Sequence, residues 1–279
     1  MFGLLLTTVG TFFLEIGSSI GKYEVSHRRE DIYTMAFLNH FGGFLLFILL
    51  VLWQGDFRFS IYSLPFWLLQ MGSEALHIWL AGKATIKSDR STWGFLRMGT
   101  VPILLICDAL LGYDIQPLQY VGILFIIMTL FLLYKQHGFT RKGVGWVIAA
   151  TINAALAITL YKHAITYYNS VAAHQLVSGI FVMAFVTWLC KHHRHHHPLR
   201  LYKEKLFVTQ SLSFAFGGIL DSFAYTLAPA SIIVTGKRCA SALFTILAGN
   251  FYFHEERLAV KLFAFVILCI GMVFLAFQT

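Results

Sequence analysis

The stretch IYTMAFLNHFGGFLLFILLVLW, residues 32–53, contains no Asp, Glu, Lys or Arg. An α-helix needs roughly 20 mainly apolar residues to cross a hydrocarbon core about 30 Å thick, so this stretch is long enough to span a membrane. Comparable stretches recur along almost the whole chain, between charged or turn-rich breaks. They predict ten transmembrane helices, at residues 2–21, 32–53, 61–82, 92–111, 117–134, 143–163, 171–190, 206–227, 231–250 and 258–277.

The overall composition agrees with a membrane environment. Of the 279 residues, 58% are hydrophobic and only 12% are charged, which leaves too few polar side chains to cover a soluble globule of this size. The first apolar stretch follows Met1 without a basic segment, so we expect it to stay as a membrane helix and not to be removed as a signal peptide. The expected fold is an all-α, multi-pass integral membrane protein of the cell (inner or plasma) membrane.

The distribution of Lys and Arg predicts an orientation. Because these residues are retained on the cytoplasmic side of membrane helices, both termini are expected outside the cytoplasm. The net charge of +8 then belongs to loops that face anionic lipid headgroups, and no nucleic-acid partner is expected. The breaks after every second predicted helix, starting with the first, contain most of the basic residues: Lys22, Arg28, Arg29, Lys83, Lys87, Arg90, Lys135, Arg141, Lys142, Lys191, Arg194, Arg200, Lys203, Lys205 and Arg257.

The second half of the chain repeats features of the first. A shift of 141 aligns Arg97 with Arg238 and Asp114 with Glu255, and a shift of 140 sets Lys22 on Lys162. The predicted repeats are residues 1–139 and 140–279, with five helices each. Because five is odd, the two copies must enter the membrane from opposite sides. Such an inverted-topology repeat is typical of secondary transporters, in which the site lies between the two halves.

The segment GKRCASALFTILAGNFYFHEE, residues 236–256, resembles the ninth helix of EamA-type, ten-helix members of the drug/metabolite transporter superfamily. A weaker copy precedes it, with Pro102 inside a helix and Gly112-Tyr113-Asp114 before the helix that begins at Pro117. The resemblance covers the whole chain in helix number and repeat, and it implies export or exchange of small organic metabolites. Many members have cytoplasmic termini, whereas the basic residues of this chain predict the opposite orientation.

Arg97 and Arg238 are the first candidates for substrate binding. Each lies roughly two turns inside its predicted helix, which is a depth of about 8 to 10 Å, and the two helices enter from opposite faces. A guanidinium remains charged and donates two parallel hydrogen bonds to a carboxylate or phosphate, so the pair could hold one anion. Lys237 is a third candidate, about 100° around the helix from its neighbour. Alternatively, these cations reach lipid headgroups or neutralise acidic residues of other helices.

Four carboxylates inside predicted helices are candidates for proton coupling: Glu15, Glu74, Asp108 and Asp221. An ionisable group in the bilayer is costly unless it faces a cavity or a partner. Glu74 and His77 are three residues apart, so they share a helix face and could relay a proton. Static pairing with buried cations is an equally good interpretation of each carboxylate, and ordinary packing is the better interpretation of His77 alone.

Two adjacent polar residues, His174 and Gln175, are further candidates for the cavity wall because they lie near the start of a predicted helix. Other polar residues, Asn39, His40 and Asn153, are expected to hydrogen-bond between helices. The small residues Gly17 and Gly21 are expected to allow close helix packing within the chain before any dimerisation, so the protein is expected to be a monomer or a homodimer.

No cofactor or metal site is expected. The tract 191–197, KHHRHHH, has imidazoles but no carboxylate or Cys ligands at a set spacing, and the four cysteines show no zinc or disulfide pattern. Two function classes remain open. The first is a secondary transporter of a small, anionic or zwitterionic metabolite, such as an amino acid. The second is a membrane-embedded enzyme that acts on a lipid-linked substrate, although no His-Glu-x-x-His or Walker A motif is present.

Overall fold

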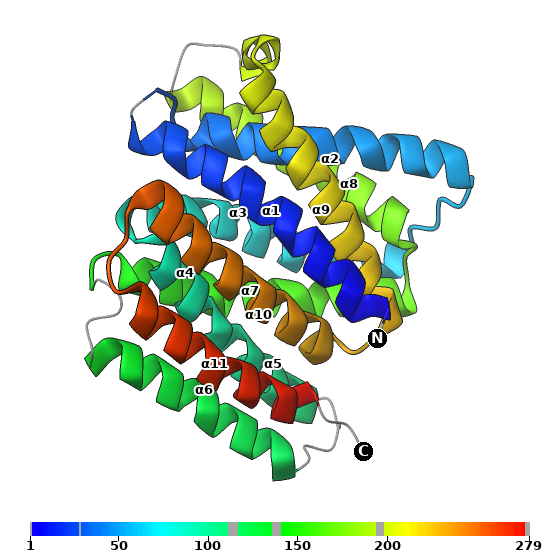
Figure 1. Cartoon of the computed structure of the whole chain (residues 1–279). Coiled ribbons are helices and arrows are strands. Elements are labelled where there is room, and N and C mark those ends of the chain that lie inside the picture. The colour runs from blue at the N-terminus through cyan, green and yellow to red at the C-terminus, as the bar shows by residue number, and fades with distance from the viewer. Residues whose placement is uncertain (1, 28, 111–116, 136–140, 194–197, 277–279) are drawn as a thin grey trace.

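The computed structural model describes residues 2–27, 29–110, 117–135, 141–193 and 198–276. These residues form a bundle of α-helices joined by short connections and 3₁₀ turns, and no strand occurs among them, which confirms the all-α prediction (Figure 1). The elements are α1 (Phe2–Ser26), α2 (Ile32–Gln54), η1 (Ile61–Ser63), α3 (Leu64–Lys87), α4 (Arg90–Leu96), η2 (Arg97–Gly99), α5 (Thr100–Leu110), α6 (Pro117–Lys135), α7 (Val144–Tyr167), α8 (Val171–His193), η3 (Pro198–Lys203), α9 (Lys205–Leu227), α10 (Ala230–Phe253) and α11 (Leu258–Ala276).

Within the described residues, seven helices are long and apolar enough to cross a membrane, namely α1, α2, α6, α7, α8, α9 and α10. The chain is therefore a multi-pass integral membrane protein. The apolar part of α11, Leu258–Phe274, is shorter. Helix α3 is long but contains Gln70, Glu74 and Lys83, which lower its hydropathy.

The predicted helix at residues 92–111 is interrupted in the structure. It consists of α4 and α5, joined by the 3₁₀ turn η2 at Arg97–Gly99. Pro102 lies in the first turn of α5 and has no backbone N–H to bond the carbonyl of Met98, four residues earlier. The break therefore places Arg97 at a turn and not in the middle of a regular helix. The predicted end of this helix, residue 111, lies outside the described residues.

Helices from the two halves of the chain interleave. Helix α1 packs along α9, α3 along α7, α2 along α8, and α6 along α11. Helices α6 and α11 lie at the lower edge of Figure 1, where α11 also packs against α10. The α1–α9 crossing depends on glycine, because a Cβ built at Gly217 would lie 2.6 Å from the carbonyl oxygen of Gly10. Gly17 and Gly21 also face α9, as expected for packing within the chain.

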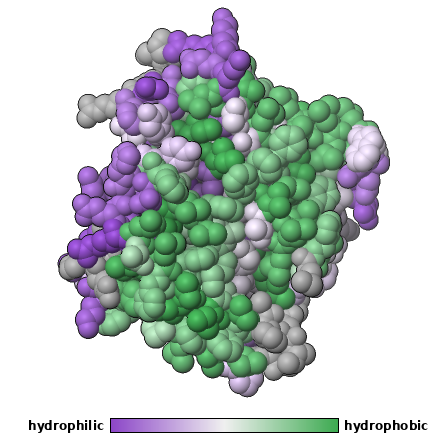
Figure 2. All heavy atoms as spheres, in the orientation of Figure 1, coloured by the Kyte–Doolittle hydropathy of each residue, from purple (hydrophilic) through white to green (hydrophobic). Residues whose placement is uncertain are grey.

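The ends of the helices separate into two groups. The ends of α1, α3, α6, α8 and α10 and the starts of α2, α4, α7, α9 and α11 lie together, away from the ends marked N and C (Figure 1). The described parts of the basic connections lie at this end of the bundle, which we call the basic end. Hydrophilic residues gather along its edges, whereas apolar residues cover most of the remaining face (Figure 2). This one-sided charge is what the positive-inside pattern predicts.

Candidate functional site

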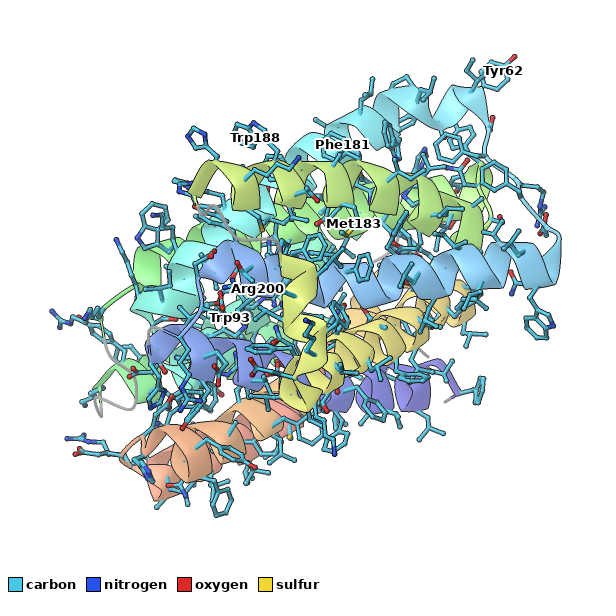
Figure 3. The ribbon with its side chains drawn as sticks, turned by 90° about the horizontal axis from the view of Figure 1, so that it is seen from above. Tyr62, Trp93, Phe181, Met183, Trp188 and Arg200 are labelled. Carbon is cyan, nitrogen blue, oxygen red and sulfur yellow. The ribbon has the colours of Figure 1, made fainter. Side chains whose placement is uncertain are left out.

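A cavity of about 490 Å³ lies inside the bundle. Its wall includes residues of α1, α2, α3, α4, η2, α7, α8, α9 and α10, whereas the described side chains of α5, α6 and α11 contribute none of the lining. The volume is in the range of sites for small organic ligands. Figure 3 shows one wall residue, Trp93, within the bundle, while Tyr62 and Trp188 lie at its periphery. Helices of both halves of the chain therefore enclose one site.

Arg97 and Arg238 both line this cavity, from η2 and α10. Arg238 is only 1% exposed, yet its Nε and Nη2 atoms have no hydrogen-bond partner in the part of the chain that the structure describes. The Nε of Arg97 has none either, and its guanidinium lies over the ring of Trp93, 4.7 Å from the centroid. Leaving a buried charge without a partner is costly. The two side chains thus hold unsatisfied donors in position for an anion.

Two of the predicted carboxylates are already paired. Glu15 forms a buried ion pair with Arg90 and accepts a hydrogen bond from the Ser241 hydroxyl at 2.5 Å. Asp221 pairs with Lys237, whose Nζ lies 2.5 Å from Oδ2, and it also accepts a hydrogen bond from Thr7 at 2.9 Å. The charges of Glu15, Asp221 and Lys237 are therefore largely compensated within the protein.

Glu74 and His77 both line the cavity from α3, as their spacing predicts. They make no hydrogen bond to each other, and within the described part of the chain the Glu74 carboxylate forms neither a hydrogen bond nor an ion pair. Lys237 and Arg97 line the same cavity. The buried Nδ1 of His77 also has no partner, and His40 of α2 is nearby. A direct relay between Glu74 and His77 is thus not formed in this structure.

The two residues predicted at the start of α8 have different positions. Gln175 lines the cavity and donates a hydrogen bond to Ser222 at 3.0 Å. His174 does not line it. Asn169 donates to the Nδ1 atom of His174 at 3.1 Å, so the proton is on Nε2, which donates to Gln70 at 2.9 Å. The imidazole is fully buried and satisfied, which fits a structural role.

His174 belongs to a hydrogen-bonded seal between the α2–α3 and α7–α8 connections. Asn169 accepts from the backbone N–H of Ser60 at 2.9 Å and donates to Ser63 at 3.0 Å. The backbone N–H of Ser170 donates to the carbonyl of Arg58 at 2.9 Å. These contacts hold the two connections together at the end of the bundle opposite the basic end.

At the basic end, Glu255 joins α10, α11 and the start of α4. Its carboxylate accepts hydrogen bonds from the Arg90 backbone N–H at 2.6 Å, the Ser91 hydroxyl at 2.5 Å and the Lys261 ammonium at 3.0 Å. Burial alone would raise the pKa of Glu255, but the Ser91 hydrogen bond and the Lys261 charge outweigh it and hold this pKa below its usual value. A carboxylate at a helix N-terminus is also stabilised by the helix dipole.

Sequence reasoning missed Arg90 and Glu255 as parts of this architecture. The sequence indicates only a basic loop residue at Arg90, although Arg90 begins α4, lines the cavity and bonds Glu15. The one available signal was the alignment of Glu255 with Asp114, but Asp114 lies outside the described residues, as does the side chain of Asp108. Residues 194–197 of the His-rich tract lie outside them too.

The donor groups of the described residues give no metal site, because no three His, Cys, Asp or Glu side chains converge on one point. The comparisons with known proteins identify a fold and nothing further. No family model matches the chain, and no curated protein is similar to it. A solved structure described only as "Crystal structure of protein" matches with a TM-score of 0.65 over 96% of each chain. At 14% sequence identity this likeness establishes a shared fold alone.

Proposed function

We propose that this protein is a secondary transporter that moves a small anionic or zwitterionic organic metabolite across the cell membrane by alternating access. The observation that carries the proposal is Arg238, a fully buried guanidinium in a cavity, with two nitrogen atoms that no group of the described residues satisfies. A bound carboxylate, phosphate or sulfate would satisfy these donors. Arg97, with its own unsatisfied nitrogen, would bind the same anion from the opposite half of the chain.

We also propose that the seven apolar helices, α3, the interrupted α4–η2–α5 segment and α11 make ten membrane crossings in two inverted repeats. Two matching contacts support the repeat. The ammonium group of Lys22 donates to the carbonyl of Ser88 at 2.6 Å, and that of Lys162 donates to the carbonyl of Ala228 at 3.3 Å. The shift of 140 that aligns the two lysines also aligns Ser88 with Ala228. Helix pairing is consistent with this symmetry, because α1 packs on α9 as α7 packs on α3.

Alternating access requires a closure at each end of the site. The proposed closures are the Asn169–His174 seal at one end and the Glu255 contacts at the basic end, because each joins segments from both halves of the chain. The lining of the cavity reaches Lys22, Ile32 and Thr85, close to the basic end. We propose that this end faces the cytoplasm, as its charge favours, and that the likeness to EamA-type transporters reflects common function.

The first experiment is a thermal-shift screen of the detergent-purified protein against anionic, zwitterionic, cationic and neutral metabolites. A ligand that binds the folded state raises apparent stability by mass action. We expect stabilisation by an anionic or zwitterionic class, and loss of that response in an Arg97→Gln/Arg238→Gln variant. Arg200→Gln is the matched control, because Arg200 is exposed in η3.

Transport itself is tested in sealed proteoliposomes with the ligand that the screen identifies. Uptake that needs an intact membrane and disappears in the double arginine variant would support the proposal. Chemical conversion of the ligand by the protein in detergent would contradict it and would favour a membrane-embedded enzyme. Undiminished transport by the double variant would exclude the two arginines as the anion site.

A further inference from the structure

The acidic residues of the cavity differ in whether a protein group bonds their carboxylates. Three carboxylates line the cavity, and two of them have partners in the protein. Glu15 bonds Arg90 and Ser241, and Asp221 bonds Lys237 and Thr7. Glu74 is the third, and within the described residues no side chain or backbone group donates a hydrogen bond to it. Its carboxylate is therefore free to change its protonation state without breaking a protein contact.

The position of Glu74 relates it to the anion site. It faces the cavity from α3, and the same cavity is lined by Lys237 of α10 and Arg97 of η2. Lys237 is already paired with Asp221. Arg97 has no carboxylate partner in the described residues and lies over Trp93 instead. Glu74 therefore shares the cavity with Arg97, a cation that a bound anion would also use.

We propose that Glu74 takes up one proton when an anion binds between Arg97 and Arg238, and releases it when the anion leaves, so that anion and proton cross the membrane together in the same direction. This inference rests on the proposed function. The proton comes from water on the side to which the cavity is open, binds a carboxylate oxygen of Glu74, and returns to water on the other side. No bond other than this O–H bond is made or broken.

The physical reason is repulsion in a poorly screened space. A bound anion competes with Glu74 for Arg97 and brings a second negative charge close to it. Two like charges that share a site cannot both stay ionised at low cost, so the weaker acid takes up a proton. For an anion of one negative charge, the added proton leaves the net charge of the cavity unchanged. The empty and loaded states would then carry the same charge through the membrane, which limits the cost of moving either one.

Other titratable groups face the same space and must be separated from Glu74 in any test. They are Glu15 and Lys22 of α1, His40 of α2, His77 of α3, Tyr161 of α7, Asp221 and Tyr225 of α9, and Lys237 of α10, together with Arg90, Arg97 and Arg238. His77 is the main competitor. It lines the cavity from the same helix as Glu74, and its buried Nδ1 has no hydrogen-bond partner among the described residues.

The test measures proton uptake when an anion binds to the full-length protein in detergent. Sulfate, succinate and glutamate serve as probes, over a pH range in which the probe itself does not titrate. Isothermal titration calorimetry in two buffers of different ionisation enthalpy counts the protons taken up. We expect uptake approaching one proton per anion in the wild type, with affinity that weakens by up to about tenfold per unit increase in pH.

The variants separate Glu74 from its neighbours. Glu74→Gln is expected to bind the probe without proton uptake and without the pH dependence, whereas Glu74→Asp is expected to keep both. Glu24→Gln is the matched control, because Glu24 is a buried carboxylate of α1 that pairs with Arg29 outside the cavity. His77→Gln is expected to retain proton uptake.

Failure of this inference differs from failure of the anion site. Binding without proton uptake, or uptake that persists in Glu74→Gln, would overturn the role of Glu74 and leave the transporter proposal intact. If none of the three probes binds, the anion site itself is contradicted. Infrared difference spectra give an independent measurement: the band of a protonated carboxylic acid should appear with the anion in the wild type and be missing in Glu74→Gln.

Discussion

The guanidinium of Arg90 and the carboxylate of Glu15 form an ion pair inside the bundle, although the two residues are 75 positions apart. Arg90 is 3% exposed and begins α4, while Glu15 lies in the middle of α1 and also accepts from Ser241 of α10. Because Glu255 accepts from the backbone N–H of Arg90, one chain of hydrogen bonds runs from the basic end to the cavity wall. A substitution at either end of this series of hydrogen bonds can therefore affect the contacts at the other end.

Removal of one member of this pair should be strongly destabilising. Arg90→Gln leaves Glu15 buried without its cation, which costs about 3–5 kcal/mol, whereas an Arg90→Met/Glu15→Met variant should lose less because no charge remains unpaired. The melting temperature in detergent measures the effect. Arg58→Gln is the control, because Arg58 pairs with Asp56 at the surface and its loss should leave the melting temperature unchanged. Equal stability of wild type and Arg90→Gln would contradict the burial of the pair.

The α1–α9 crossing can be tested with two neighbouring glycines. Gly217→Ala places a methyl group against the carbonyl oxygen of Gly10 and should cost about 1–3 kcal/mol, because the helices must move apart. Gly218→Ala is the matched control, since a Cβ there meets no heavy atom within 4 Å. Higher helix propensity should leave the control as stable as the wild type or slightly more stable. A neutral Gly217→Ala variant would mean that α1 and α9 are not in close contact.

The sequence predicts a helical membrane protein because a long apolar segment in lipid must satisfy its backbone hydrogen bonds internally, as an α-helix does. Helix ends were predicted less well. The helix is interrupted at Arg97–Gly99 because Pro102 has no backbone N–H to donate a hydrogen bond. Helix α3 continues to Lys87 through polar residues at which its hydropathy predicts an end. The length of an apolar run predicts which residues lie within the membrane. A helix that lines a cavity with polar residues has a lower hydropathy, so its ends are harder to predict.

The candidate site was predicted in part. The depth of Arg97, Arg238, Glu74 and the other charged residues followed from helix spacing, and all of those with described side chains line one cavity. The sequence did not predict which of these carboxylates pairs with which cation. Whether Glu15 or Glu74 meets a cation depends on the rotation of helices from different halves of the chain, for which a single sequence contains no measure. His174 shows the same limit, because one of its two partners, Gln70 on α3, is 104 positions away in the chain.

The pH dependence of stability should reveal Glu255. Its pKa is held below the usual value, so the folded state binds this proton less tightly than the unfolded state, whose Glu pKa is about 4.3. The stabilisation is therefore complete above about pH 4.3 and is lost as the pH falls through the lower pKa of the folded state. Glu255→Gln should lower stability at neutral pH by about 1.5–3 kcal/mol and should flatten the loss of stability in acid.

Melting temperatures of the wild type and Glu255→Gln across this pH range measure the difference. Glu256→Gln is the control, because Glu256 is the exposed neighbour and should leave both the neutral value and the acid slope unchanged. If Glu255→Gln has the same acid slope as the wild type, another carboxylate is responsible for the acid sensitivity and the Glu255 contacts do not hold the start of α4.

Substitution of His174 distinguishes a structural role of this residue from a role in substrate binding. His174→Phe removes the acceptor for Asn169 and the donor for Gln70, so two buried polar groups lose a partner and stability should fall by about 1–3 kcal/mol. Because His174 does not line the cavity, the affinity for an anion that the thermal-shift screen identifies should stay within about twofold of the wild type, a difference well below 1.4 kcal/mol. Arg238→Gln provides the opposite pattern, with loss of anion binding. Normal stability of His174→Phe combined with lost anion binding would place His174 in the substrate site and would require the α8 start to move into the cavity.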